Sequence, residues 1–264
     1  MDIRVLQQCI STAKSKRWNF DSDFEAAITR TAEIREGKRP GSDLVVLDLE
    51  FLPSSGQILE IAVVESVSGK ILLDTKVKHD CLNLLSNKLD YMAGISSFRM
   101  TQKFFGKSLE AYTQNGQDVH AIAKALKSAG ITKQTIILVW HSSWYDLTLL
   151  QGFLEAAGYS DILPSKENCV RLVPFLWMNM PPPAGRRRFP GKLEVIFPLF
   201  FPCHKLIGMN HHALEDCLQT RLLMMAFEKL VKPLKERRGW QPTDLVQIGQ
   251  RTLGDWVLKP LPKD

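Results

Sequence analysis

The 264-residue sequence contains no uninterrupted apolar run close to the length of about 18 residues that a membrane-spanning helix needs. Its first residues, MDIRVLQQCISTAKSKRWNF, also lack the apolar core and the cleavage site of a secretory signal. We therefore expect an intracellular protein, cytoplasmic or nuclear, with no membrane partner.

Cysteines are few and odd in number, and they are scattered along the chain, which is typical of reduced thiols and not of a disulfide framework. They are Cys9, Cys81, Cys169, Cys203 and Cys217. Low-complexity segments are also missing, and 45% hydrophobic and 23% charged residues indicate an ordinary globular chain. The net charge of +6 is compatible with a polyanionic partner, although many basic proteins bind no nucleic acid.

The chain divides into three parts. Residues 1–40 are polar and compatible with helices, so we predict an N-terminal helical extension, which is a candidate for contact with a protein partner. Residues 41–235 form the predicted main domain, and residues 236–264 a C-terminal tail packed on it. Within the main domain, β-rich segments at 44–52, 57–66 and 70–77 predict three consecutive strands.

Helical and strand patterns alternate in the rest of the domain. We expect helices at 118–130 and from residue 145, strands at 135–141 and 169–173, and a long helix at 213–235. A proline- and arginine-rich loop, PPPAGRRRFPGK, separates the last strand from the last helix. The order of these elements predicts an α/β fold with a mixed sheet and helices on its faces.

Two acids interrupt the otherwise apolar segment LVVLDLEFL. Strand alternation places Asp48 and Glu50 on one face, about 7 Å apart along the strand. Like charges buried side by side are costly unless cations neutralise them, so the pattern suggests a metal site. A strand with one face open to solvent would show the same alternation.

A third acid, Asp146, follows the apolar strand TIILVWH where the chain turns into a helix. Ligands bind at the carboxyl ends of strands in open α/β sheets, which favours a functional role. An acid stabilised in the first turn of a helix is the alternative interpretation.

The stretch MNHHALEDCLQT contains a fourth acid, Asp216, near the edge of the buried side of a helix. Five helical positions correspond to a rotation of about 500°, so His211 would point away from Asp216 if both lay on the helix. His211 can reach the same site only from the loop before the helix. Asn210, His211 and His212 fit such a loop.

Taken together, LDLEF, HSSWYDLTLL and HHALEDCLQT resemble the three motifs of the DEDDh group of DnaQ-like 3′→5′ exonucleases. The resemblance spans residues 44–230 in the same order, with KLEVIF similar to the helix before the third motif. It implies a ribonuclease H-like fold, with a mixed five-stranded sheet of three antiparallel strands followed by alternating helices and strands. Phe51 and Ser142 stand where relatives frequently have threonine and asparagine.

The resemblance also implies a mechanism and a substrate. Asp48, Glu50, Asp146 and Asp216 would hold two Mg²⁺ or Mn²⁺ ions about 3.5–4 Å apart, and His211 would act as the general base. Single-stranded RNA or DNA would be shortened from its 3′ end to nucleoside 5′-monophosphates, in a process such as RNA processing or RNA silencing. Substrate contacts are also predicted. Phe51 or Trp144 would stack on a base, and the arginines of the loop would bind backbone phosphates, namely Arg186, Arg187 and Arg188.

Two other interpretations remain open from the residues. Zinc could be held by a set drawn from Cys203, His204, His211, His212 and Cys217, although their spacing matches no common structural zinc pattern. The chain could also be a non-catalytic module that uses an exonuclease fold to bind protein or nucleic acid. The presence of all four acids and the histidine favours an enzyme.

Overall fold

A computed structural model describes residues 3–52, 55–80, 115–237 and 239. The chain folds as an α/β structure around one mixed five-stranded sheet, with the strand order β3-β2-β1-β4-β5. The bounds of the strands are β1 Leu44–Phe51, β2 Ile58–Glu65, β3 Ile71–Lys76, β4 Ile136–Val139 and β5 Cys169–Arg171. The predicted α/β class and the five-stranded mixed sheet are confirmed.

Strand β1 is central, and its two neighbours run in different directions. It pairs antiparallel with β2 and parallel with β4, while β2 pairs antiparallel with β3 and β4 pairs parallel with β5. Short hairpins connect the three antiparallel strands, whereas parallel neighbours need longer crossover connections. Residues 44–47 at the start of β1 are buried, because β1 lies at the centre of the sheet.

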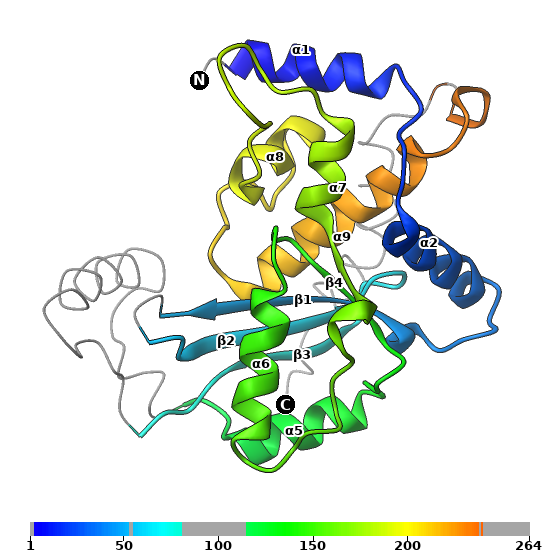
Figure 1. The fold of residues 1–264 in the computed structure, drawn as a ribbon. Helices are drawn as coiled ribbons and strands as arrows, with labels where there is room; N and C mark the ends of the chain where they lie inside the picture. Colours follow the sequence, from blue (N-terminus) through cyan, green and yellow to red (C-terminus); the bar gives the residue numbers. More distant parts are fainter. Residues whose placement is uncertain (1–2, 53–54, 81–114, 238, 240–264) are drawn as a thin grey trace, which may run out of the picture.

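Helices cover both faces of this sheet (Figure 1). Helices α5 and α6 lie on one face, and α1, α7, α8 and α9 lie on the other, with α2 packed near β5 and β1. Short 3₁₀ segments lie at Gly41–Asp43, Lys166–Asn168 and Leu234–Arg237. The helix bounds are α1 Ile3–Lys14, α2 Ser22–Arg35, α5 Val119–Ser128, α6 Tyr145–Glu155, α7 Leu172–Asn179, α8 Leu193–Phe200 and α9 Ala213–Leu230.

The N-terminal helices α1 and α2 contribute side chains to the hydrophobic core. Trp18 and Phe24 are buried, and the Phe24 ring stacks on Phe175 of α7 with the ring centroids 3.7 Å apart. Trp18 also packs against Phe227 of α9. The segment between and including α1 and α2 is thus packed against the sheet-covering helices through aromatic contacts.

The clearest differences from the sequence prediction lie at the last strand and at the last helix. The last strand ends at Arg171 instead of residue 173, because Leu172 begins α7, a helix that the apolar pattern did not reveal. Pro174 falls in the first turn of α7, where a missing N–H costs nothing. Helix α9 ends at Leu230 instead of residue 235, consistent with Pro233, which disfavours helix at the preceding residue. Most of the predicted tail, 236–264, lies outside the described residues.

Candidate metal centre and active site

Asp48 and Glu50 point to the face of the sheet that helix α9 covers. Along β1, Leu44 and Val46 belong to the core on this face, and Leu47 and Leu49 to the core on the other. Because side chains alternate along a strand, Asp48 and Glu50 lie on the same face as Leu44 and Val46. Both are partly exposed, so the α9 face of β1 changes from apolar to acidic at residue 48.

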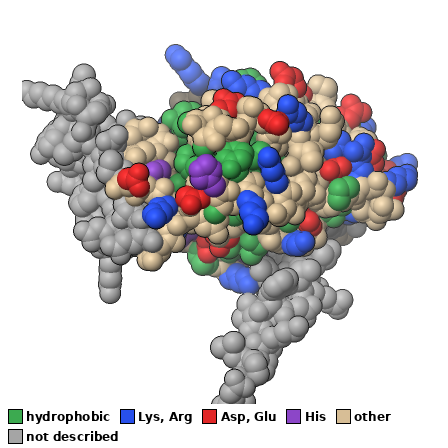
Figure 2. Space-filling view, turned by 90° about the horizontal axis from the view of Figure 1, so that it is seen from below, with side chains coloured by type: hydrophobic (Ala, Val, Ile, Leu, Met, Phe, Trp, Pro, Cys, Tyr) green, Lys and Arg blue, Asp and Glu red, His purple; other side chains and the backbone are tan. Residues whose placement is uncertain are grey.

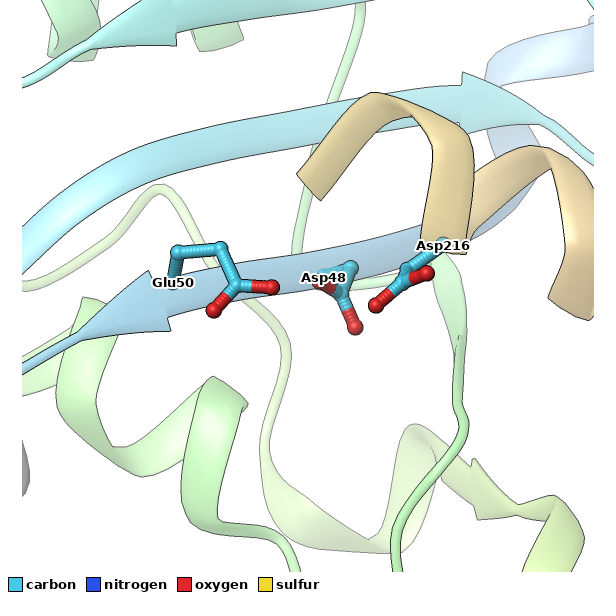
Figure 3. A group of neighbouring side chains, drawn as sticks. All are labelled: Asp48, Glu50 and Asp216. Atoms are coloured by element: carbon cyan, nitrogen blue, oxygen red, sulfur yellow. The ribbon is translucent and has the colours of Figure 1, made fainter. Parts of the chain in front are cut away.

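Helix α9 brings the third carboxylate to the same place. Its buried Cys217 thiol donates to the backbone carbonyls of Val46 and Ala62, which holds the start of the helix against β1 and β2. The adjacent residue, Asp216, then meets the acids of β1. Figure 3 shows Asp48 between Glu50 and Asp216. One carboxylate oxygen of each of the three residues lies within 4.8 Å of the others.

The two oxygens of Asp216 have different surroundings. Oδ2 accepts a hydrogen bond from the backbone N–H of His211 at 3.2 Å. Oδ1 is buried, and among the residues that the structure describes it has no hydrogen-bond partner. A buried acceptor without a partner is costly, by roughly 1–3 kcal/mol. Such an atom beside two other carboxylates is a suitable ligand for a cation.

Electrostatics in the group favour neutral carboxyl groups when no cation is bound. Burial, together with the charges of Asp216 and Asp146, raises the pKa of Asp48 well above its ordinary value. Burial and the same kind of repulsion raise the pKa of Glu50 to about 9. Burial also raises the pKa of Asp216 to about 7, against the opposing effect of the His211 N–H. No ion pair in the described part of the chain joins a lysine or arginine to these three acids.

Asp146 lies close to this group without joining it. It is 7% exposed in the first turn of α6, and burial raises its pKa to about 7. Its charge contributes to the raised pKa of both Asp48 and Glu50. The structure therefore brings together three of the four predicted carboxylates and places the fourth within their electrostatic reach.

The two adjacent histidines face different carboxylates. His211 lies in the loop before α9 in a left-handed conformation, with φ 69°, and its Nε2 is 3.6 Å from Glu194 Oε2. His212 occupies the N-cap position of α9, and its Nδ1 is 3.7 Å from Glu60 Oε2. Only His211 of the pair lines a cavity together with Asp48 and Asp216.

A buried glutamine supports the loop that carries His211. Asn210 donates from Nδ2 to Gln219 Oε1 at 3.1 Å, and Gln219 donates from Nε2 to the carbonyl of Leu206 at 3.0 Å. Gln219 is fully buried on α9. These bonds hold both sides of the loop to the helix, which helps to maintain the unusual backbone of His211.

Sequence reasoning missed two acids at the site, Glu60 and Glu194. Glu60 pairs with Glu50 across the sheet, and its Oε2 accepts from the N–H of Ala213 at 3.4 Å. Glu194 lies in the first turn of α8 and lines the same cavity as His211. Glu60 interrupts the apolar run of β2, which ends at a second acid, Glu65, and this interruption is a signal like that of the acids in β1. Glu194 carries no comparable sequence signal.

The predicted substrate residues lie on three separate segments and differ in solvent exposure. Phe51 ends β1 and packs on Tyr145, with ring centroids 5.1 Å apart. Trp144 lies just before α6, beneath the guanidinium of Arg171 at 4.0 Å from the ring centroid. Arg186, Arg187 and Arg188 are exposed in the loop between α7 and α8.

The five zinc candidates are not gathered. Cys217 is buried against β1 and β2, and Cys203 is exposed in the loop before α9. Within the described ranges, the closely spaced set of potential metal-binding atoms consists of carboxylates and includes none of these five residues. The described structure therefore favours hard oxygen ligands over a sulfur- and nitrogen-based zinc site.

Comparison of the chain with models of known protein families, with curated proteins and with solved structures finds no match in any of the three.

Among the described helices, none is both long enough and apolar enough to cross a membrane. On the face shown in Figure 2, lysine and arginine side chains are interspersed with acidic and uncharged ones and form no single basic patch.

Proposed function

We propose that the chain is a metal-dependent 3′→5′ exonuclease that hydrolyses phosphodiester bonds of single-stranded RNA or DNA. The observation that carries the proposal is the group formed by Asp48, Glu50 and Asp216, in which one carboxylate oxygen of each residue lies within 4.8 Å of the others. Within the described part of the chain, Oδ1 of Asp216 is also buried without a hydrogen-bond partner. The sheet order and the flanking helices are compatible with the ribonuclease H-like fold of such enzymes.

The residues fit a divalent metal centre. Carboxylate oxygens suit Mg²⁺ and Mn²⁺, and the raised pKa values describe a site that lacks positive charge. Asp48, Glu50 and Asp216 would hold the metal, with Asp146 as a fourth ligand. When bound, two such ions would activate the attacking water and neutralise charge on the leaving 3′ oxygen.

The histidine would handle the proton. The backbone N–H of His211 donates to Asp216, and His211 lines the same cavity as Asp48 and Asp216. A neutral imidazole there can accept a proton from the attacking water. Glu194, 3.6 Å from Nε2, would orient the ring and stabilise it once it is protonated.

Phe51, Trp144 and the three loop arginines would contact the substrate, and the products would be nucleoside 5′-monophosphates. RNA processing or RNA silencing is the cellular context that we propose for this activity.

The test is a hydrolysis assay with labelled single- and double-stranded RNA and DNA in Mg²⁺ or Mn²⁺, followed by identification of the products. We expect stepwise shortening from the 3′ end, release of nucleoside 5′-monophosphates, and complete loss of activity in a metal chelator. The Asp216→Asn variant serves as the inactive control. Metal-independent cleavage, or binding without any cleavage, would refute the proposal, and the second result would indicate a non-catalytic binding module.

A further inference from the structure

The chain that follows α1 lies beside the C-terminal end of α9, which is the end remote from Asp216 (Figure 1). The backbone N–H of Trp18 donates to the carbonyl of Leu230 at 3.0 Å, and Arg17 Nε donates to the carbonyl of Val231 at 2.9 Å. These bonds join two chain segments that are both rich in cationic side chains.

The two segments carry positive charge and almost no acid. Residues 14–17 and 229–237 contain seven lysine and arginine side chains and one acidic side chain, Glu236. Within the described ranges, none of the seven cations forms an ion pair. Burial lowers the pKa of Lys14 and that of Arg237, with no opposing effect from a described acid. The seven cations are Lys14, Lys16, Arg17, Lys229, Lys232, Lys235 and Arg237.

Helix dipoles account for only part of this cluster. Cations stabilise the C-terminal end of a helix within its last turn, and Lys14 and Lys229 occupy these positions in α1 and α9. Arg17 caps α9 through one of the five N–H groups of its guanidinium. The other cations lie beyond the last turn of either helix, where the dipole no longer explains them. Four of the cations are exposed or half-buried and form what we call the basic surface: Lys16, Arg17, Lys232 and Lys235.

Helix α9 sets the distance between the basic surface and the acids. From Asp216 to Leu230 the helix axis advances about 21 Å, at about 1.5 Å per residue. Phosphates follow one another at about 3.4 Å along each strand of a duplex, and at larger steps in a stretched single strand. A strand whose 3′ end lies at the acids therefore reaches the basic surface with about six nucleotides or fewer.

We infer that the basic surface binds the phosphate backbone of the nucleic acid on the 5′ side of the bond that is hydrolysed, so that affinity rises with substrate length. The inference rests on the proposed function and specifies its substrate class, an oligonucleotide long enough to span α9. Lysine and arginine neutralise phosphates and release counterions without regard to sequence. Phe20 is 37% exposed and follows Arg17 closely in the chain, and its ring offers a stacking surface for an unpaired base.

The experiment measures binding separately from hydrolysis. Fluorescence anisotropy of 5′-labelled oligothymidylate of about 20 nucleotides is recorded in Ca²⁺, in place of Mg²⁺, over a series of salt concentrations. Lys16→Gln and Lys235→Gln together should weaken binding on the order of 5-fold at low salt. The salt slope should fall by up to about 0.7 for each phosphate contact that is lost. A trinucleotide, which is too short to span α9, should compete poorly.

The variants are chosen to remove charge without disturbing the fold. Lys16 and Lys235 are exposed, and glutamine places no negative charge at the helix ends. Each single change should give about half the effect of the pair on the salt slope. Lys124→Gln together with Lys127→Gln removes the same charge from exposed positions of α5, on the opposite face of the sheet, and should leave affinity and slope unchanged. Thermal unfolding checks that every variant is folded.

Unchanged affinity and salt slope in the folded Lys16→Gln/Lys235→Gln protein would overturn the inference, as would an equal loss in the α5 variant or strong competition by the trinucleotide. Polyglutamate that binds more tightly than the oligonucleotide, and depends on the same two lysines, would also overturn it and indicate an acidic protein partner.

Hydrolysis of the long oligonucleotide, with binding that is insensitive to the two lysines, would leave the proposed function standing and remove the basic surface from it. Binding that depends on the lysines, without hydrolysis in Mg²⁺ or Mn²⁺, would support the basic surface as a nucleic-acid contact and remove the exonuclease.

Discussion

Helix α9 carries a buried carboxylate near each end, and the two have opposite surroundings. Near the C-terminal end, Glu228 is 6% exposed and accepts two hydrogen bonds from the guanidinium of Arg35, at 2.5 and 2.8 Å. Near the N-terminal end, Asp216 is 9% exposed and lies beside two more acids, and one of its oxygens has no hydrogen-bond partner among the described residues. The same helix therefore buries one acid that has an arginine partner and one that has none within the described structure.

The difference separates a structural acid from a functional one. A bidentate arginine compensates for the desolvation of Glu228 and joins α9 to α2. Asp216 has no such partner, and burial, together with the charges of Glu215 and Glu194, raises its pKa and makes its charged form costly. An arrangement that is unfavourable within the protein becomes favourable when a cation binds, which is why we assign function to the N-terminal end of α9.

The largest effect should come from replacing one carboxylate of the acidic site with an amide. Asp48→Asn or Asp216→Asn should lower the hydrolysis rate by about 10³-fold or more, because a metal centre contributes several kcal/mol to the transition state. Without divalent ions, neither change should lower the melting temperature, because each removes repulsion. Steady-state kinetics and thermal unfolding in a chelator measure the two quantities.

Glu228→Gln is the matched variant at the other end. It should lower the free energy of unfolding by about 1–2 kcal/mol, since charged hydrogen bonds to a half-exposed Arg35 are removed, and it should leave the rate nearly unchanged. A Glu228→Gln protein that is stable but inactive, or an Asp216→Asn protein that is active, would contradict the distinction between the two ends.

The next effect concerns the histidines at the start of α9. His211→Ala should lower the rate about 10²- to 10⁴-fold at saturating Mn²⁺, the range for removal of a general base, while metal binding is preserved. His212→Ala should lower it much less, because His212 faces Glu60 and lies outside the cavity. Single-turnover rates and metal titrations of both variants provide the measurement. The reverse ranking would show that His212 is the base.

A third effect is on stability and its dependence on pH. The pKa of Asp146 and Asp216 is raised to about 7 and that of Glu50 to about 9, whereas unfolded carboxyl groups titrate near about 4. The folded chain binds more protons between these values, so stability present at low pH is lost as the pH rises through the window. We expect the metal-free melting temperature to fall between about pH 5 and pH 8.

Saturating Mn²⁺ should offset this loss, because an ion that binds only the folded chain stabilises it. Asp48→Asn should make the metal-free decline shallower, and Glu228→Gln should leave it as it is. A metal-free protein that becomes more stable over the same pH range would show that the acids at the site are compensated by a partner.

The smallest effect concerns arginine side chains, which also differ between a paired and an exposed position. Arg35 is engaged with Glu228, whereas Arg186 and Arg187 are exposed. Replacing Arg186, Arg187 and Arg188 together with alanine should weaken single-strand binding. The salt slope of binding should fall by up to about 0.7 for each phosphate that the loop no longer neutralises. Affinity measured over a series of salt concentrations tests this, and an identical slope would exclude the loop from the binding surface.

Much of the architecture was predictable because the local hydrophobic patterns of the sequence agree with the strands and helices that form. The alternation of LVVLDLEFL predicts a strand with both acids on one face, and this is how β1 presents Asp48 and Glu50. The five-residue spacing from His211 to Asp216 predicts a histidine in a loop before the helix, and His211 lies there with a positive φ. Helix α7 was missed because its short, uniformly apolar sequence has no distinguishing period.

The sequence by itself determined the residue types, the faces on which they lie and the order of the elements, since these follow from backbone periods and turn chemistry over a few residues. Only the tertiary structure decided which acids meet. Asp216 reaches Asp48 because α9 packs across β1 and β2, and Glu60 joins them through strand register. Likewise, only packing brings the 181–192 loop to the cavity, through two indole hydrogen bonds between residues that no local pattern connects.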